Sequence, residues 1–341
     1  MIRTLLIVIF SSQLLIAQNF NDLFFGTDTT LDVISWNIES FPKHSNTALR
    51  VQEILLNLDA DVYALQEIYD TVALKQLVGN MSEYECYFNK NYNGGLAYIY
   101  NINSLQINAE YEIFTSQQYW NALPRSPQIL DCTFHGENFI IINNHFKCCG
   151  DGSLNINDYT DEENRRLQAT TLLKQYIDST LANRNVILLG DLNDELIDNN
   201  LDNVFRDLLI DSTNYLFVDM QIAQGSSINW SYPRWPSHLD HILITNELFS
   251  NLKDTSSFSS VIRIDDYMNS WNDYEYYISD HRPVGLQLNF NIVSSINESI
   301  SRDKILIKVV DALGKEIQKG FKGLIFKLYK DGTVEKNIII E

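Results

Sequence analysis

Side chains that could do chemistry stand at the ends of short apolar runs at six places along the chain. They fall in the segments SWNIES, ALQEI, NNHFK, GDLND, LDHI and SDHRPV. A rigid strand can fix the side chain at its end, so such ends often carry functional groups. Any one of these segments alone would be an ordinary turn or a satisfied histidine. Together they supply every group that hydrolysis of a phosphoester requires.

One part of this set could bind a hard divalent cation. Glu67 offers a carboxylate and Asn37 an amide oxygen, and Mg²⁺ typically takes one or two carboxylates, several waters and the substrate phosphate. A cation would offset the repulsion between a phosphate and an acidic protein and would stabilise charge on the phosphoryl oxygens. We therefore expect Mg²⁺ as the cofactor, with Ca²⁺ and Mn²⁺ as alternatives.

Other members of the set could handle protons and the phosphate. Asp191 can accept a proton from an attacking water or orient it, and Asn193 can bind the phosphate without adding repulsion. A histidine paired with a carboxylate is oriented and tuned by it. His281 and Asp240 are the candidate pair.

Two further residues of the segment NNHFK, His145 and Lys147, could donate to the phosphate or to the leaving group. Asp194 and Glu195 directly follow Asn193 and have no evident role. We expect both of these carboxylates to face solvent.

The elements that must position these groups alternate along the sequence. Short β-rich runs such as 31–37, 61–67 and 186–189 are interleaved with helical patterns such as 46–58 and 162–181. This order indicates an α/β fold with a sheet core. The chain has 341 residues, 45% of them hydrophobic, which is enough for one large domain and a small one. Its net charge of −19 argues against a protein that binds polyanions through a broad basic surface.

Both ends of the chain differ from the large domain. Residues 1–17 combine Arg3 with an interrupted apolar run, which is typical of a signal peptide cleaved after Ala17 and too short for stable membrane insertion. The composition changes near 295–303, and 303–341 contains three strand-like runs separated by glycine-containing turns. We expect a small C-terminal β module there. The alternative is a final hairpin of the main domain.

The four cysteines are Cys86, Cys132, Cys148 and Cys149. In an exported protein they could form disulfides, in any of three complete pairings. Because a bridge between neighbours is strained, we expect Cys148 and Cys149 each to pair with a distant cysteine.

In order and spacing the six segments resemble the endonuclease/exonuclease/phosphatase superfamily, the DNase I-like group, over about residues 30–290. The resemblance implies a four-layer α/β sandwich, with two packed β-sheets flanked by helices, for a domain at 28–292. Which of Asp191 and His281 activates water stays open.

The resemblance also implies a role for individual residues. These are Asn37 and Glu67 at the metal, Asp280 beside it, Asp191 and Asn193 orienting water and phosphate, Asp240 paired with His281, His145 as a histidine of DNase I-like members, and Arg125 binding phosphate.

The tail resembles the C-terminal sorting domain of the bacterial type IX secretion system, through the segments DALGKE and DGTVEK. With the signal peptide, it implies release outside the cell or at its surface, with the type IX machinery as a partner. Removal of the tail on export stays open.

We interpret the protein as a secreted, monomeric, metal-dependent phosphodiesterase and, more specifically, a nuclease that degrades extracellular DNA or RNA. One alternative is a phospholipase C, sphingomyelinase-like or phosphomonoesterase activity on lipid or small phosphate esters. Trp230, Tyr232 and Trp235 could form an exposed aromatic patch for that purpose, but we expect them to pack over the core. The other alternative is a non-catalytic surface-binding protein.

Overall fold

The computed structural model describes residues 20–88, 94–290, 306–311, 314–317, 323–330 and 334–339. The chain divides into two units, residues 1–290 and 291–341. The segment predicted to be a signal peptide, residues 1–17, lies outside the described residues. Within the described residues, every helix is too short or too polar to cross a membrane.

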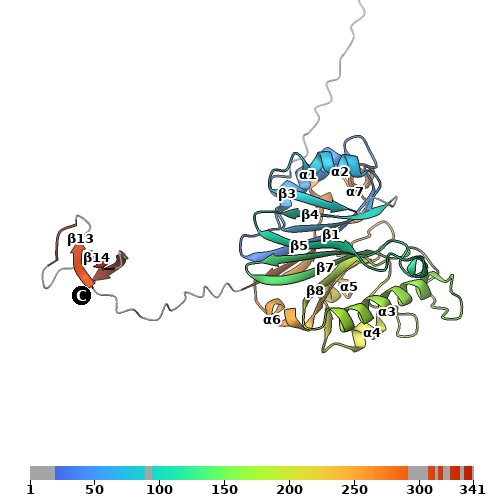
Figure 1. The fold of residues 1–341 in the computed structure, drawn as a ribbon. Coiled ribbons are helices and arrows are strands. Elements are labelled where there is room, and N and C mark those ends of the chain that lie inside the picture. The colour runs from blue at the N-terminus through green and yellow to red at the C-terminus, as the bar shows by residue number, and fades with distance from the viewer. Residues whose placement is uncertain are drawn as a thin grey trace, which may run out of the picture. The chain divides into compact units, whose positions relative to one another are not determined.

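Two six-stranded sheets pack face to face in the larger unit (Figure 1). The first sheet contains, in spatial order, β11 (Phe258–Val261), β12 (Val284–Asn289), β1 (Thr30–Phe41), β2 (Val62–Ile68), β4 (Gly95–Asn101) and β3 (Tyr84–Phe88). The second contains β5 (Leu105–Glu112), β6 (Gln128–Phe134), β7 (Glu137–His145), β8 (Asn185–Asp191), β10 (Asp240–Thr245) and β9 (Tyr215–Phe217). Both sheets mix parallel and antiparallel pairs.

Helices cover the outer face of each sheet (Figure 1). The first sheet carries α1 (Thr47–Leu58), α2 (Thr71–Val78) and α7 (Trp271–Tyr277). The second carries α3 (Glu162–Thr180), α4 (Arg206–Ile210) and α5 (Met220–Ala223), and a short α6 (Phe249–Leu252) follows β10. This arrangement confirms the predicted four-layer α/β sandwich.

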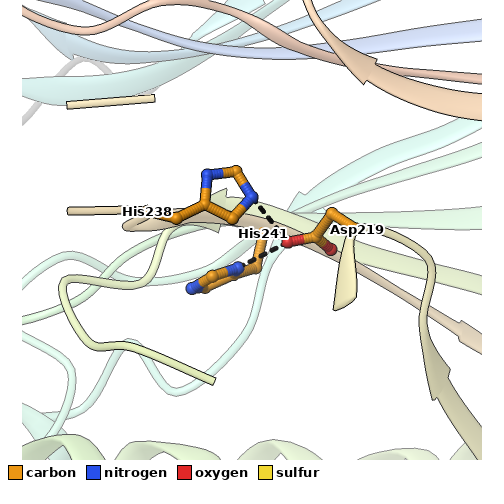
Figure 2. Close-up of side chains that lie close together, drawn as sticks. All are labelled: Asp219, His238 and His241. Carbon is orange, nitrogen blue, oxygen red and sulfur yellow. Dashed lines mark hydrogen bonds and ion pairs between the residues drawn. The ribbon is translucent and has the colours of Figure 1, made fainter. Parts of the chain in front are cut away.

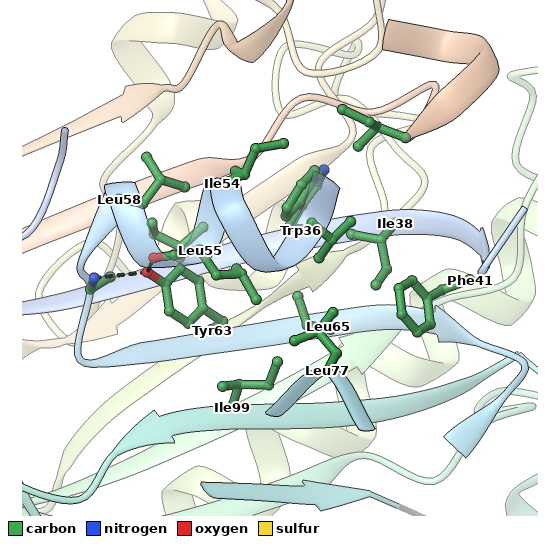
Figure 3. Packing of buried hydrophobic residues seen from close by; sticks show 14 of the residues in the cluster. Trp36, Ile38, Phe41, Ile54, Leu55, Leu58, Tyr63, Leu65, Leu77 and Ile99 are labelled. Carbon is green, nitrogen blue, oxygen red and sulfur yellow. Dashed lines mark hydrogen bonds between the residues drawn. The ribbon is translucent and has the colours of Figure 1, made fainter. Parts of the chain in front are cut away.

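Helix α1 packs on the first sheet through one apolar stripe (Figure 3). Leu58 lies four residues after Ile54 and three after Leu55, so the three share one face of the helix. That face lies against Trp36 and Tyr63, both fully buried. The Tyr63 hydroxyl donates to the Leu55 carbonyl at 2.6 Å, which satisfies a polar group that would otherwise be costly to bury.

Successive side chains of a strand point to opposite faces of the sheet, and this alternation decides which side chains meet between the two sheets. Val33 of β1 and Leu189 of β8 are fully buried in the layer between them. Because side chains two residues apart in a strand point the same way, Asp191 continues the inter-sheet face to the end of β8, and Asn37 continues it to the point where the pairing of β1 with β2 shifts. The polar groups predicted at these ends are therefore directed into the space between the sheets.

A buried polar layer ties the two sheets together just beneath these ends. Asn143 of β7 accepts a hydrogen bond from Gln66 of β2 at 2.8 Å. Its own amide donates to the carbonyls of Leu65, at 3.0 Å, and Ala97, at 3.1 Å. These bonds cross between the sheets and fix the spacing on which the site depends.

The smaller unit is a three-stranded antiparallel sheet of β13 (Leu306–Asp311), β14 (Gly323–Tyr329) and β15 (Val334–Ile339). The three strand-like runs expected from the sequence are confirmed as this small β module.

Candidate active site

Three of the predicted side chains lie next to one another at one end of the second sheet. His145, the last residue of β7, pairs in register with Asp191 of β8, which in turn pairs with Asp240 of β10. All three side chains are almost completely buried. Gly190 allows β7 and β8 to approach so closely, because its φ is 142° and a Cβ there would lie 1.9 Å from the Asn144 carbonyl oxygen.

His281 joins this row from the loop that precedes β12. Its Nδ1 lies 2.7 Å from Oδ2 of Asp240, and its Nε2 lies 3.8 Å from Oδ2 of Asp191. Burial lowers the pKa of His281, but the two carboxylates outweigh burial and raise the pKa to about 10. His281 is therefore an imidazolium at neutral pH, with Nδ1 donating to Asp240. The Tyr232 ring packs on it with centroids 4.8 Å apart.

Asp191 is the most crowded group of the site. Its Oδ2 accepts a hydrogen bond from the Asn37 amide at 2.9 Å. Burial raises the pKa of Asp191 to about 7, a shift that the positive charge of His281 opposes and the negative charge of Asp240 increases. A carboxylate with this pKa can take up a proton near neutral pH.

His145 lies on the other side of Asp191, with Nε2 3.5 Å from the Asp191 carboxylate. Burial, and then the positive charges of Arg125 and His281, lower the pKa of His145 well below its usual value, so its imidazole is neutral. Arg125 thus lies near the site as predicted. It is half-buried, and its Nε donates to the Gly94 carbonyl at 3.3 Å.

A second group of oxygen atoms gathers beside Asp191 at the end of the first sheet. The Asn37 amide that binds Asp191 also donates to Glu67 Oε1, at 3.3 Å. The backbone N–H of Asp280 donates to Glu39 Oε2 at 3.0 Å. Glu67 has a φ of 64°, a backbone region that non-glycine residues rarely adopt and that recurs at functional sites.

These carboxylates repel one another. The pKa of Asp280 rises to about 6, chiefly through burial; the charges of Glu39 and Glu67 add to the rise, whereas His281 and Lys43 oppose it. A divalent cation would relieve this repulsion, and its preferred ligands are oxygen atoms of this kind. The structure therefore places Glu67 and Asp280 close enough for their charges to interact, with Asn37 bonded to Glu67. It also adds Glu39, a residue of the segment SWNIES that the sequence interpretation did not single out.

The two residues predicted to bind phosphate beside β7 and β8 differ in position. Asn193 turns back on Asp191: its backbone N–H donates to Asp191 Oδ1 at 3.1 Å, and its φ is 55°. Lys147 instead donates to the Cys148 carbonyl at 2.8 Å and lies 3.8 Å from the Glu162 carboxylate. The structure thus brings Asn193, but not Lys147, into contact with the other predicted groups.

Asp194 is buried, so the prediction that it faces solvent is wrong, and its neighbour Glu195 is half-buried. The Asp194 carboxylate accepts from Arg166 Nε at 2.7 Å. Arg166 Nη1 also donates to the backbone carbonyls of Lys147, at 2.9 Å, and Cys149, at 2.7 Å. Helix α3 therefore holds the loops that follow β7 and β8 through one buried arginine.

A second cluster, of Asp219, His238 and His241, lies fully buried beside the start of β10 (Figure 2). Each residue offers one carboxylate oxygen or ring nitrogen that could bind a metal ion, and these three atoms lie within 4.8 Å of one another. The same is true of Asp191, Asp240 and His281. Asp219 Oδ2 lies 3.0 Å from Nε2 of His238 and 2.6 Å from Nδ1 of His241.

The remaining ring nitrogens of this cluster are also occupied. His238 Nδ1 accepts from the Ser231 backbone N–H at 3.3 Å, and His241 Nε2 donates to the Asp194 carbonyl at 2.9 Å. Burial lowers the pKa of His241, but Asp219 more than reverses this and raises it. Both nitrogens of His241 face acceptors, so it is an imidazolium in a buried ion pair, with no lone pair for a metal.

The aromatic residues after α5 are only partly covered. The Trp230 indole donates to the Ile222 carbonyl at 3.0 Å, and Tyr232 packs on His281, so the expectation of packing is correct for both. Trp235 is 71% exposed, and for this residue the expectation is wrong.

Comparison with known proteins agrees with this fold. The sequence profile described as "Endonuclease/Exonuclease/phosphatase family" matches residues 34–281. No curated protein matches the chain in sequence.

Solved structures with the same fold include three of different origin. TDP2 of D. rerio, complexed with single-strand DNA product, is 15% identical, with 77% of this chain and 100% of that chain covered and a TM-score of 0.59. The human nocturnin catalytic domain is 18% identical (77% and 94% covered; TM-score 0.54). A mannosyl-6-phosphatase of Bacteroides thetaiotaomicron is 16% identical (76% and 100% covered; TM-score 0.53).

Proposed function

Because the chain belongs to the Endonuclease/Exonuclease/phosphatase family, it is a metal-dependent phosphoester hydrolase, and we propose that its substrate is extracellular nucleic acid. Glu67, Asp280 and Asn37 would hold the cation. When bound, the cation supplies positive charge that stabilises the phosphoryl oxygens and the leaving group.

The protonation states favour one division of the proton-handling roles. His281 is already an imidazolium at neutral pH, so it cannot take a proton from water there; its Nε2 can instead donate a hydrogen bond to a phosphoryl oxygen. Asp191, with a pKa near 7, is suited to accept the proton of the attacking water. In this proposal Asn193 and Arg125 orient the phosphate.

One observation favours a chain-like substrate: a groove of about 400 Å³ lies on the surface next to the candidate site. It begins at Glu39, which contacts Asp280, and its lining includes Lys43, Arg234 and Tyr276. The Arg234 side chain is 62% exposed and Tyr276 is 60% exposed. Arg234 pairs with Glu275, which lines the same groove; the guanidinium could pair instead with a phosphate of the chain, and an exposed ring can stack on a base. The fold relative TDP2 of D. rerio was solved with single-strand DNA product, which is consistent with this proposal.

An activity screen tests the substrate class. The purified protein would be incubated with Mg²⁺, Ca²⁺ or Mn²⁺, and in parallel with a chelator, on plasmid, single-stranded DNA, RNA, sphingomyelin, a sugar phosphate and a bis-aryl phosphate. We expect metal-dependent cleavage of a nucleic acid at the highest kcat/KM. Faster turnover of sphingomyelin or of the sugar phosphate would replace the nuclease assignment with a lipid or small-ester activity.

Two variants in the groove test binding of the polymer separately from hydrolysis of the phosphoester. Arg234→Ala and Tyr276→Ala should raise KM for single-stranded nucleic acid about tenfold each, because each removes one contact worth roughly 1 to 3 kcal/mol. Neither should change hydrolysis of the bis-aryl phosphate, which is too small to fill the groove. Lys253→Ala, at an exposed cation beyond α6, is the matched control and should leave both activities unchanged.

We also propose that the protein is exported, on the basis of the signal-peptide pattern of residues 1–17 and the separate β module of the tail. In a host with a type IX secretion system, the mature protein should begin at Gln18 and appear in the medium or on the cell surface. Deletion of 303–341 should retain it in the periplasm while preserving its hydrolytic activity after purification. Retention of Met1, or equal release without the tail, would contradict the proposal.

A further inference from the structure

The loop that follows β7 carries two adjacent cysteines with their sulfur atoms in contact. Cys149 Sγ lies 2.9 Å from Cys148 Sγ, closer than two sulfur atoms approach without an interaction between them. Both residues are exposed, and Cys149 has a φ of 72°. The loop backbone thus turns the second side chain back onto the first.

Neither cysteine has a distant partner, contrary to the expectation from the sequence. All four cysteines are present as separate thiols. Cys132 is completely buried between the two sheets, where it belongs to the apolar core. Cys86 packs against the outer core of the first sheet, under α1 and α2. The only sulfur atom that Cys148 and Cys149 can each reach is that of its neighbour.

The loop is held in this shape by contacts that do not involve the sulfur atoms. Arg166 binds the carbonyl oxygen of Cys149, and the Glu163 carboxylate accepts from the backbone N–H of Gly152 at 2.7 Å. Between them, Gly150 has a φ of 110°, and a Cβ there would overlap the Glu163 carboxylate at 2.2 Å. The backbone therefore presents both thiols to solvent on one side while the other side is anchored to α3.

We propose that Cys148 and Cys149 are a reversible redox site that closes to a disulfide between the two neighbours. The oxidant is a small-molecule disulfide such as oxidised glutathione. The thiolate of one cysteine attacks it, releasing one glutathione thiol, and the second cysteine then attacks the mixed disulfide and releases the other. The cysteine pair loses two electrons and two protons, which the two glutathione thiols receive.

Because it joins adjacent residues, this disulfide is easy to reduce. Neighbouring Cα atoms are about 3.8 Å apart, whereas most disulfides span about 4.4 to 6.8 Å between Cα atoms, so the closed ring is strained and more readily reduced. The ratio of thiol to disulfide in the surrounding solution therefore decides whether the two cysteines are reduced or bridged.

Mass spectrometry tests the bridge directly. The full-length protein would be equilibrated with oxidised and reduced glutathione, alkylated with iodoacetamide and digested with trypsin, which yields residues 148–165 as one peptide containing both cysteines. In the oxidising buffer we expect this peptide to lack two hydrogen atoms and to carry no alkyl group. In the reducing buffer it should carry two. Two alkyl groups in both buffers, or a cross-link to a peptide with Cys86 or Cys132, would overturn the proposal.

Variants of the individual cysteines test whether the two sulfur atoms act as a pair. Cys148→Ser and Cys149→Ser should each expose one thiol that is alkylated or glutathionylated in the oxidising buffer, and Cys86→Ser should retain the bridge. The reduced wild-type protein should bind one equivalent of phenylarsine oxide, a reagent for closely spaced thiols. Either serine variant should lose this binding at least tenfold. Equal binding by wild type and both variants would also refute the pair.

Discussion

The Asp240 carboxylate lies 2.7 Å from Nδ1 of His281, although Asp240 belongs to the second sheet and His281 to the loop that leads into β12 of the first. This contact directs Nε2 of the imidazolium toward Asp191, 3.8 Å away. It also accounts for the raised pKa of His281, because a buried carboxylate stabilises the charged ring. The pair therefore joins the two sheets at the point where the reaction would take place.

Replacing Asp240 with asparagine should reduce catalysis without unfolding the protein. The neutral amide of Asp240→Asn would no longer supply the negative charge that orients and protonates His281, so kcat should fall on the order of 10²- to 10⁴-fold. Hydrolysis of the bis-aryl phosphate measures the rate, and far-UV circular dichroism reports the fold. Asp266→Asn, at an exposed carboxylate, is the control. An Asp240→Asn rate within about twofold of wild type would rule out this role.

Removing one carboxylate from the metal ligands should weaken the effect of metal on stability. A bound ligand stabilises the folded state by about 2.7 kcal/mol when its concentration is 100 times its Kd. Mg²⁺ should therefore raise the melting temperature of the wild type but raise that of Glu67→Gln much less. Glu53→Gln, at an exposed position of α1, should behave as wild type. The same Mg²⁺-induced rise in Glu67→Gln would show that Glu67 is not a ligand.

Arg166 should be important for stability even though it lies outside the reacting groups. Its guanidinium binds the buried carboxylates of Asp194 and Glu163. Because Arg166→Met leaves both carboxylates unpaired, it should lower the free energy of unfolding by about 3 to 5 kcal/mol. Arg263→Met removes a partly exposed ion pair and should cost less than about 1 kcal/mol. Urea denaturation measures both values, and equal losses would contradict the difference in burial.

The Asp219–His241 pair should stabilise the protein most in mildly acidic solution. The interaction with His241 and His238 lowers the pKa of Asp219 despite its burial, so its contribution is present above its ordinary pKa of 3.8 and is lost as pH falls through the lowered value. The pKa of His241 is raised, so its contribution is present below 6.5 and is lost as pH rises through the raised value.

Comparison with Asp219→Asn isolates this contribution, because the other titrating groups are shared. The free energy of unfolding of wild type minus that of the variant should be largest between about pH 4 and 6.5 and should decrease above that range. Urea denaturation at a series of pH values provides the measurement. A difference that does not change from about pH 5 to 9 would mean that His241 is not an imidazolium in the folded protein.

The central elements of the fold could be predicted because their apolar patterns are long. The run expected at 31–37 lies within β1, and the helix expected at 162–181 matches α3 almost residue for residue. The edge strands β5 and β11 could not be predicted in this way. Each has a neighbour on one side only and few buried side chains, so its sequence lacks a continuous apolar run.

Site residues could be predicted where a functional side chain ends a strand, as His145 and Asp191 do. The buried charged residues that support the site are harder to predict from the sequence. Arg166 lies on α3 among apolar positions, and nothing in the sequence indicates that it points inward, because its partner Asp194 is 28 residues away. Asp219 likewise follows a strand of only three residues and meets His241 through tertiary packing alone.

The register of β7, β8 and β10 has a consequence for how this protein can vary in length. His145, Asp191 and Asp240 face one another because the three strands pair in a fixed register. An insertion of one residue within β8 would turn Asp191 to the opposite face, toward the helical layer, and would empty the centre of the site. Insertions in the connecting loops do not alter this register. Homologues that keep the activity should therefore differ in loop length while these strands tolerate neither insertion nor deletion.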